Sequence, residues 1–348
     1  MPMTIPRQTD LASLRTSLAS SWHARRSDVT ALVSAEYEAL RQATPAWTSI
    51  GWFAVLYIGG LIVLWWWQMH RGGSWFALGV LIGLLGVTWF VRRWWLARQQ
   101  FQMAVNEALY GVVGYALGVP LEHRHNLTLQ RSWFGGMKIV PRTTERTAIV
   151  ADLERSALLT ETITEHAVDD SVTIMMADRQ VTVHELRLTR VEQRGKESVE
   201  TELFLGLFAH ITLKKSLTGR TYISTNGDRT GFAHRTFWSR IIGNEVKETV
   251  LESNEFERDL HVATTDPIEA RYILTPAFMY DVHEWWKEHR ENIRLAFQGQ
   301  DCFILLPDAH LPLQTGPSSL DDARVLAHLE VIARPIWRVL QLVHDMRV

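Results

Sequence analysis

Two charge-free apolar runs near the start of the chain constrain its fold more than any other feature. Residues 50–69 contain no charged side chain over 20 positions, and residues 74–91 contain none over 18. Each run is long enough to cross the ~30 Å hydrocarbon core of a bilayer as an α-helix. Only four residues separate them, so the second helix must return antiparallel to the first. The sequence therefore predicts a transmembrane helical hairpin within residues 47–93; the alternative is two buried helices of a soluble fold.

The distribution of arginines predicts the orientation of this hairpin. Arg41 precedes the first run and Arg92, Arg93 and Arg98 follow the second, whereas the connecting loop carries Arg71 alone. Because arginine and lysine favour the cytoplasmic side, we expect a multi-pass protein of the bacterial inner membrane with both termini in the cytoplasm. Tryptophan concentrates at membrane interfaces, and it is frequent near the ends of both runs: Trp47, Trp52, Trp65, Trp66, Trp67, Trp75, Trp89, Trp94 and Trp95.

Three small residues share one face of the second predicted span. Gly79, Gly83 and Gly86 recur at intervals of four and three residues, a spacing that permits close approach of two helices. We expect this face to pack within the hairpin or between two copies of the chain, which leaves a homo-oligomer open. Neither span contains Asp, Glu, Lys or Arg, which argues against an ion channel or a proton relay within the hairpin.

Amphipathic helices are predicted on both sides of the hairpin. Residues 1–46 are interpreted as an N-terminal cytoplasmic helical region that begins near Asp10, and residues 94–118 as a juxtamembrane helix. Apolar residues recur every three or four positions in both segments, so we expect the two helices to pack together. These positions are Leu11, Leu14, Leu18, Trp22, Val29, Leu32, Val33, Tyr37 and Leu40 in the first segment, and Phe101, Val105, Leu109, Val112 and Val113 in the second.

After Pro120 the pattern changes and strand signals dominate. Residues 119–348 are predicted to form a cytoplasmic α+β domain with a mostly antiparallel sheet and flanking helices. Residues 143–159 are expected to combine a short β-like stretch with a helix. Further helices are expected from Pro276 to about residue 289 and over residues 320–346, where Pro335 should introduce a kink. Strands are expected at residues 172–176, 181–191, 202–213, 220–224, 249–251, 260–264, 293–297 and 302–306.

Part of this domain resembles a known family. The shared positions are residues 252–257, Val262, residues 266–272, residues 274–276 and Met279, preceded by Phe204, Gly206, Phe208, Gly219 and Thr221. They resemble DUF3137, a family of bacterial membrane proteins of unknown function. The resemblance implies an N-terminal helix, two membrane spans, a cytoplasmic α+β domain and an association with LemA-type membrane proteins. It implies no reaction and supplies no catalytic residues.

Two charged residues lie inside the shared motif. Glu269 and Arg271 could form a recognition pair for a ligand. The alternative, which we favour, is that they lock a strand of the sheet to the following helix through hydrogen bonds and an ion pair.

Histidine and cysteine form no catalytic or metal-binding pattern. Cys302 is the single cysteine, so a cysteine-based zinc site is excluded. His283 and His289 are six positions apart and do not share a helix face. His123 and His125 beside Glu122, and His166 near Asp169 and Asp170, are interpreted as solvated loop residues. We therefore predict no catalytic, cofactor-binding or metal-binding residue.

A basic and aromatic stretch between Lys214 and Lys247 is the strongest candidate contact region. Cations beside a membrane attract anionic headgroups, and interleaved aromatic side chains add apolar contact. The alternatives are a solvated hairpin tip whose aromatic side chains pack on the core, and, much less favoured, a site for single-stranded nucleic acid. The candidate lipid or partner contacts are Arg229, Phe232, Arg235, Phe237, Trp238 and Arg240.

Together these features predict a membrane-anchored interaction or sensing module that docks a protein partner or anionic lipid headgroups. The net charge of −2 carries no electrostatic signature for nucleic acid, and no nucleic-acid partner is expected. A membrane-tethered hydrolase or lipid-modifying enzyme is the alternative, and a pocket of converging carboxylates and histidines with perturbed pKa values would favour it.

Overall fold

The computed structural model describes most of the chain after residue 74 and the first helical region. The described residues are 11–44, 60, 65–66, 69, 75–125, 127–131, 137–141, 143–159, 163–176, 178–194, 197–226, 247–249, 251, 253–289, 292–307, 316–317 and 319–346. The chain divides into two compact units. One consists of residues 1–21, 110–313 and 326–348, and the other of residues 22–109 and 314–325.

The smaller unit is built mainly from helices. Helix α1 (Leu11–Leu32) begins in the larger unit and continues into this one, followed by α2 (Ser34–Ala43) and most of the long helix α4 (Trp75–Leu117). The ring of Tyr37 lies 5.8 Å from that of Phe101, and the Trp22 indole donates a 2.9 Å hydrogen bond to Asp322. Trp22, Val29, Val33, Phe101, Val105 and Leu109 are buried. The expected packing of the two amphipathic segments is thus confirmed at the contact of Tyr37 with Phe101, although Leu32 and Tyr37 are 71% and 51% exposed.

The two predicted membrane spans overlap only in part with the residues that the structure describes. The first predicted span, residues 50–69, lies largely outside them, and the second falls within α4. Among the residues that the structure describes, no helix combines the length and the apolar character needed to cross a membrane.

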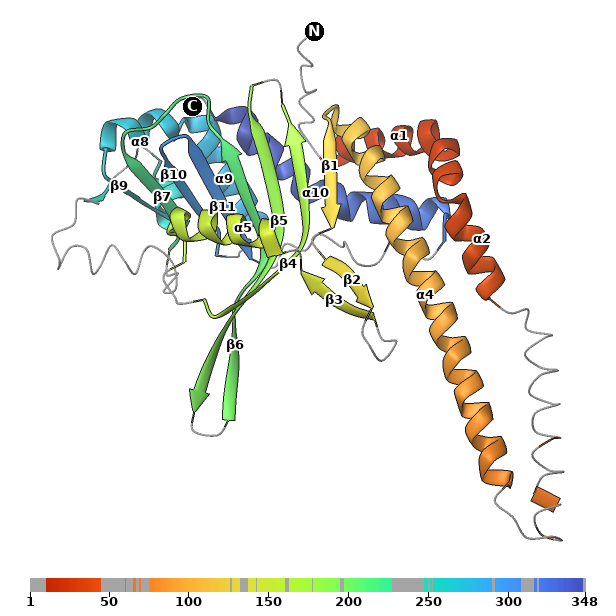
Figure 1. The fold of residues 1–348 in the computed structure, drawn as a ribbon. Helices are drawn as coiled ribbons and strands as arrows, with labels where there is room; N and C mark the ends of the chain where they lie inside the picture. The colour runs from red at the N-terminus through yellow and green to blue at the C-terminus, as the bar shows by residue number, and fades with distance from the viewer. Residues whose placement is uncertain are drawn as a thin grey trace. The chain divides into compact units, whose positions relative to one another are not determined.

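The larger unit contains an antiparallel sheet, as expected for an α+β domain (Figure 1). Nine described strands pair in the order β1-β4-β5-β6-β11-β10-β7-β9-β8. A separate hairpin pairs β2 (Leu127–Arg131) with β3 (Met137–Pro141). The strands of the large sheet are β1 (Leu121–His125), β4 (Glu165–Met175), β5 (Gln180–Arg194), β6 (Glu197–Thr212), β7 (Arg220–Thr225), β8 (Lys247–Glu248), β9 (Leu260–Thr264), β10 (Arg294–Gln298) and β11 (Asp301–Pro307).

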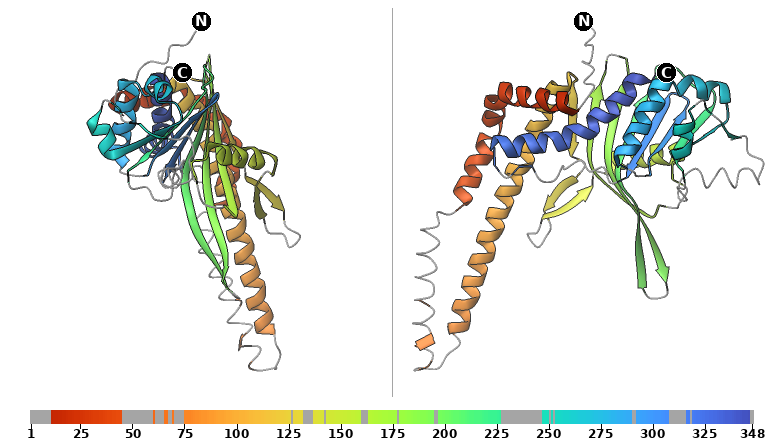
Figure 2. Two further views of the ribbon diagram at one scale, coloured as in Figure 1. Left: turned by 90° about the vertical axis from the view of Figure 1, so that its left-hand side faces the viewer. Right: turned by 180° about the vertical axis from the view of Figure 1, so that it is seen from behind.

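Helices cover both faces of this sheet. Figure 2 shows α5 (Thr143–Ser156) on one face and α8 (Pro267–Ile273) with α9 (Pro276–His289) on the other. Alternation along β10 explains the division, because successive side chains point to opposite faces. Ala296 belongs to the core cluster that includes Leu153 of α5, whereas Phe297 contacts Phe278 of α9 at 5.8 Å. The remaining helices are α7 (Asn254–Asp259) and α10 (Asp322–Asp345), which contains Pro335.

Two predicted elements need correction. Thr249 and Leu251 are not in a strand, because the ladder with β9 consists of Lys247 and Glu248 and is followed only by a 3.1 Å backbone hydrogen bond from Thr249 to Val262. Residues 143–159 contain no strand among those described, since α5 occupies them from Thr143 to Ser156. Burial of Ile149 and Leu153 against the sheet outweighs the weak β signal of this segment.

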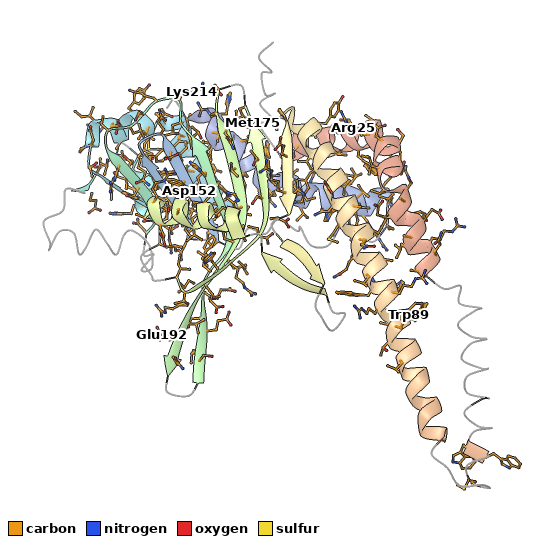
Figure 3. The ribbon with its side chains drawn as sticks, viewed as in Figure 1. Arg25, Trp89, Asp152, Met175, Glu192 and Lys214 are labelled. Atoms are coloured by element: carbon orange, nitrogen blue, oxygen red, sulfur yellow. The ribbon has the colours of Figure 1, made fainter. Side chains whose placement is uncertain are left out.

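The ladder between β5 and β6 continues past the rest of the sheet. β4 pairs with β5 only as far as Thr189, whereas β5 and β6 remain paired to Arg194 and Glu197. The outer part of this hairpin therefore forms a two-stranded arm, which carries Glu192 (Figure 3).

Gly206 marks the point where β6 first pairs with β11. Its φ is +157°, and a Cβ built there would lie 2.0 Å from the carbonyl oxygen of Leu306. No L side chain fits without displacing one of the two strands.

We predict that Gly206→Ala destabilises the purified protein by about 2–4 kcal/mol, because overpacking adds to an unfavourable φ. The matched control is Gly111→Ala in α4, where a Cβ meets nothing within 4 Å and helix propensity should add about 0.5–1 kcal/mol of stability. Denaturant unfolding measures both changes. An equal stability of the two variants would contradict the close approach at Gly206.

Candidate functional site

The predicted contact residues lie outside the part of the chain that the structure describes. Arg229, Phe232, Arg235, Phe237, Trp238 and Arg240 all fall between residues 227 and 246. Gly79, Gly83 and Gly86 lie on α4. A Cβ at Gly86 would meet nothing within 4 Å, so this glycine faces open space in the isolated chain. Both sets of residues remain predictions.

Glu269 holds the start of β7 against α8. Its carboxylate accepts hydrogen bonds from the backbone N–H groups of Thr218 (3.0 Å) and Gly219 (2.7 Å). A Cβ at Gly219 would lie 2.8 Å from Cβ of Asp266, so only glycine permits this contact. Glu269 therefore has the locking role that we favoured. Arg271 is exposed and has no ion pair with Glu269, so the expected ion-pair part of the lock is wrong.

A polar cluster joins α5 to the sheet. Asp152 (labelled in Figure 3) and Arg155 come from α5, His210 from β6 and Asp301 from β11. Arg155 bridges both carboxylates, at 2.7 Å from Asp152 and 3.2 Å from Asp301. The imidazole of His210 lies between the same carboxylates, with Nε2 at 2.6 Å from Asp301 and Nδ1 at 3.4 Å from Asp152. The ring of His210 also stacks on Phe303 at 4.8 Å.

This cluster is a closed network of Arg155, His210 and two carboxylates. Each carboxylate contacts both Arg155 and His210, and a nucleophile would need a hydrogen bond to the imidazole to be activated by it. Within the described ranges, His210 contacts carboxylates and forms no hydrogen bond with a serine, threonine or cysteine. The arrangement fastens α5 to the sheet and leaves no ring nitrogen directed at an open site.

A second polar cluster is buried beside the C-terminal part of α4. The imidazole of His123 stacks on the ring of Tyr110 at 4.0 Å, and its Nε2 lies 3.4 Å from the carboxylate of Asp170. The side chains of His123 and Asp170 are 3% and 1% exposed. The interpretation of His123 and Asp170 as solvated loop residues is therefore wrong. Burial, followed by the charge of Asp170, raises the pKa of Tyr110 well above its usual value, so this phenol stays neutral.

Two more histidines are held in the interior by hydrogen bonds. His184 shares a 2.6 Å hydrogen bond with the hydroxyl of Ser171, and burial lowers the pKa of His184 to about 3. It is neutral at physiological pH. His283 of α9 contacts the carboxylate of Asp259 at 2.9 Å, and this hydrogen bond, with Arg258, lowers the pKa of Asp259. His283 thus anchors α9 to the end of α7. No described group of three or more His, Cys, Asp or Glu residues has the arrangement of a metal site.

Helix α4 carries a band of exposed apolar side chains with arginines at one end. Leu85 and Trp89 are 61% and 62% exposed, and Val91 and Trp95 also face outward (Figure 3 labels Trp89). The guanidinium of Arg93 lies 5.6 Å from the Trp89 ring, and that of Arg98 lies 5.4 Å from the Trp94 ring. Trp65, Trp66 and Met69, the described large residues of the preceding segment, are exposed as well.

The comparisons with known proteins agree with the resemblance. Residues 202–347 match the family model DUF3137, described as a protein of unknown function. The matched region includes β6 from Glu202 onward, where Gly206 lies, and the lock around Glu269. No curated protein matches.

One solved structure is similar to part of the fold. The crystal structure of the mycobacterial trehalose monomycolate transport factor A, TtfA, aligns with 66% of this chain and 94% of its own, at 9% identity and a TM-score of 0.32. A likeness at this level carries no functional inference.

We predict that Glu269→Ala lowers the free energy of unfolding by about 1–3 kcal/mol, because it leaves the buried N–H of Gly219 without its acceptor. Arg271→Ala should change stability by no more than about 0.5 kcal/mol, as expected for an exposed residue without partners. Thermal and denaturant unfolding of the purified variants test the pair. A larger loss for Arg271→Ala than for Glu269→Ala would contradict the assignment of the lock.

Proposed function

We propose that this chain is a membrane-anchored interaction or sensing module. A helical hairpin at about residues 50–69 and 74–91 holds it in the bacterial inner membrane, with both termini in the cytoplasm. The α+β domain then docks a protein partner or anionic headgroups beside the bilayer. The proposal adds a membrane location and a binding role to what the family match establishes, which is a domain of unknown function.

The exposed apolar band of α4 carries this proposal. Soluble proteins rarely leave several large apolar side chains together in water, yet Leu85, Trp89, Val91 and Trp95 are all at least half exposed. Lipid would cover the same side chains without any rearrangement of the helix. The unbroken charge-free run before Arg92 supports this assignment.

The aromatic and cationic side chains at the end of the band support the same assignment. Tryptophan and arginine are typical of the boundary between hydrocarbon and water. Arg93 over Trp89 and Arg98 over Trp94 support a boundary near residues 89–98. The helix continues to Leu117, which gives the anchor a direct connection to the domain.

The polar clusters favour a binding role over the alternative hydrolase or lipid-modifying enzyme. Catalysis needs a base with a free nitrogen or carboxylate directed at a substrate. His210 lies between two carboxylates, and His184 and Ser171 are bonded to each other but both buried away from a substrate, so we assign these groups to the fold. The residues that remain available for contact are exposed side chains and the predicted loop at Arg229, Arg235 and Arg240.

We predict that the full chain, expressed in a bacterial host, stays in the membrane pellet after alkaline carbonate washing, because a spanning helix resists extraction that removes peripheral proteins. A variant with residues 50–91 replaced by a flexible linker should be released. Immunoblotting of pellet and supernatant measures the partition, and circular dichroism verifies that the variant is folded. Release of the unaltered chain by carbonate would contradict the anchor.

A further inference from the structure

The outward surface of α8 and α9 combines apolar and basic side chains. Ile268 and Tyr272, which lie one helical turn apart on α8, are 82% and 46% exposed, and Tyr280 of α9 is 64% exposed. Arg271 of α8 is exposed beside them. The amino group of Lys215 lies 4.6 Å from the centre of the Tyr272 ring. We call Lys215, Ile268, Arg271, Tyr272 and Tyr280 the α8–α9 face.

The acidic residues of α8 are committed to backbone hydrogen bonds. Asp266 caps the helix by accepting from the N–H groups of Ile268 (2.9 Å) and Glu269 (3.1 Å). Glu269 is directed at Thr218 and Gly219. Neither carboxylate is available to neutralise the cations of the surface.

Three cations near α8 are exposed and form no ion pair within the described residues. Lys215, Arg220 and Arg271 are exposed, and within the described part of the chain none of the three forms an ion pair. Arg220 lies next to the start of α8, because its carbonyl accepts from the N–H of Thr265 at 3.0 Å. Lys215, Arg220 and Arg271 thus lie on or next to α8, which also exposes Ile268 and Tyr272, whereas the acidic Glu284 near Tyr280 on α9 is paired with Lys287 at 2.9 Å.

We propose that the α8–α9 face docks an acidic segment of a partner protein, with apolar side chains of that segment covering Ile268 and Tyr280. This inference rests on the proposed function, because the anchor would limit the search for the partner to the membrane. Opposite charges accelerate encounter and set the register of binding. Tyrosine and arginine at the centre of a patch are the residue types that dominate the energy of protein interfaces.

The composition of the face favours a protein over a lipid surface. Headgroup-binding patches typically gather four to eight cations with Trp, Phe or Leu as the inserted residues. The face has two cations, Lys215 and Arg271, with Arg220 as a third near the start of α8, and both of its aromatic residues are tyrosines. Its location within the DUF3137 match also separates it from the anchor segment in the sequence.

The experiment is site-specific photo-crosslinking of the full chain in its native membrane. A photo-reactive phenylalanine derivative replaces Tyr272 or, in a second variant, Tyr280. The same derivative at Val199 of the polar arm is the control for non-specific capture. The crosslinked peptides are identified by mass spectrometry.

The expected result is a discrete adduct from Tyr272 and Tyr280, absent from Val199, whose partner peptide is net acidic. The adduct should be lost when Lys215→Glu and Arg271→Glu are combined. It should be kept in Val331→Glu, which adds a negative charge at an exposed position of α10. Both variants should retain the unfolding temperature of the parent, which shows that the loss is not misfolding.

Four outcomes would overturn the proposal: no adduct, adducts with lipid alone, adducts with a second copy of this chain alone, or an adduct that survives charge reversal. Carbonate washing of the same membranes separates this failure from a failure of the anchor. A chain that remains in the pellet but yields none of the expected adducts keeps the proposed anchoring and loses the docking face.

Discussion

Strand β6 is the constraint on which the larger unit depends. It pairs with β5 on one side and with β11 on the other, so it joins the strands β1, β4 and β5 to the remaining five. The pairing with β11 begins at Gly206, where a Cβ would lie 2.0 Å from the Leu306 carbonyl oxygen. Before that residue β6 pairs with β5 alone, and beyond the Thr189–Glu202 pair, where β4 also ends, the two strands form the arm. Gly206 therefore lies where β11 leaves the sheet, four residues inside the start of the arm.

The polar side chains at the junctions of helix and sheet are directed at one another. Arg155 and His210 both contact Asp152 and Asp301 between α5 and the sheet, and Glu269 satisfies the backbone at the start of β7. Buried polar groups without partners are costly, and these networks remove that cost at each junction of helix and sheet. The groups left for recognition are exposed ones, namely the apolar band of α4 and the α8–α9 face. This division is the physical basis for proposing binding rather than catalysis.

Local signals in the sequence predicted most of the fold, and contacts between distant residues account for what they missed. The strand at 260–264 and the helix beginning at Pro276 follow from alternation and from the helix preference of proline in a first turn. The burial of His123 against Asp170 does not, because it depends on the antiparallel register of β1 and β4. The His210 cluster likewise depends on distant contacts, because His210 and Asp301 are 91 residues apart in the sequence. The α8–α9 face was missed. Asp266 followed by Pro267 indicates the start of a helix, but the exposure of Ile268 within that helix is visible only in the structure.

The most direct test of the account is the accessibility of single cysteines on α4. Cys302 is buried and is first replaced by alanine, after which Leu85→Cys and Tyr115→Cys are introduced separately. Both parent side chains are more than half exposed on the protein surface, so only a bilayer distinguishes them. In inside-out vesicles we expect a membrane-impermeant maleimide to label Tyr115→Cys readily and Leu85→Cys only after detergent is added. Equal labelling of the two positions in intact vesicles would contradict a membrane-embedded α4.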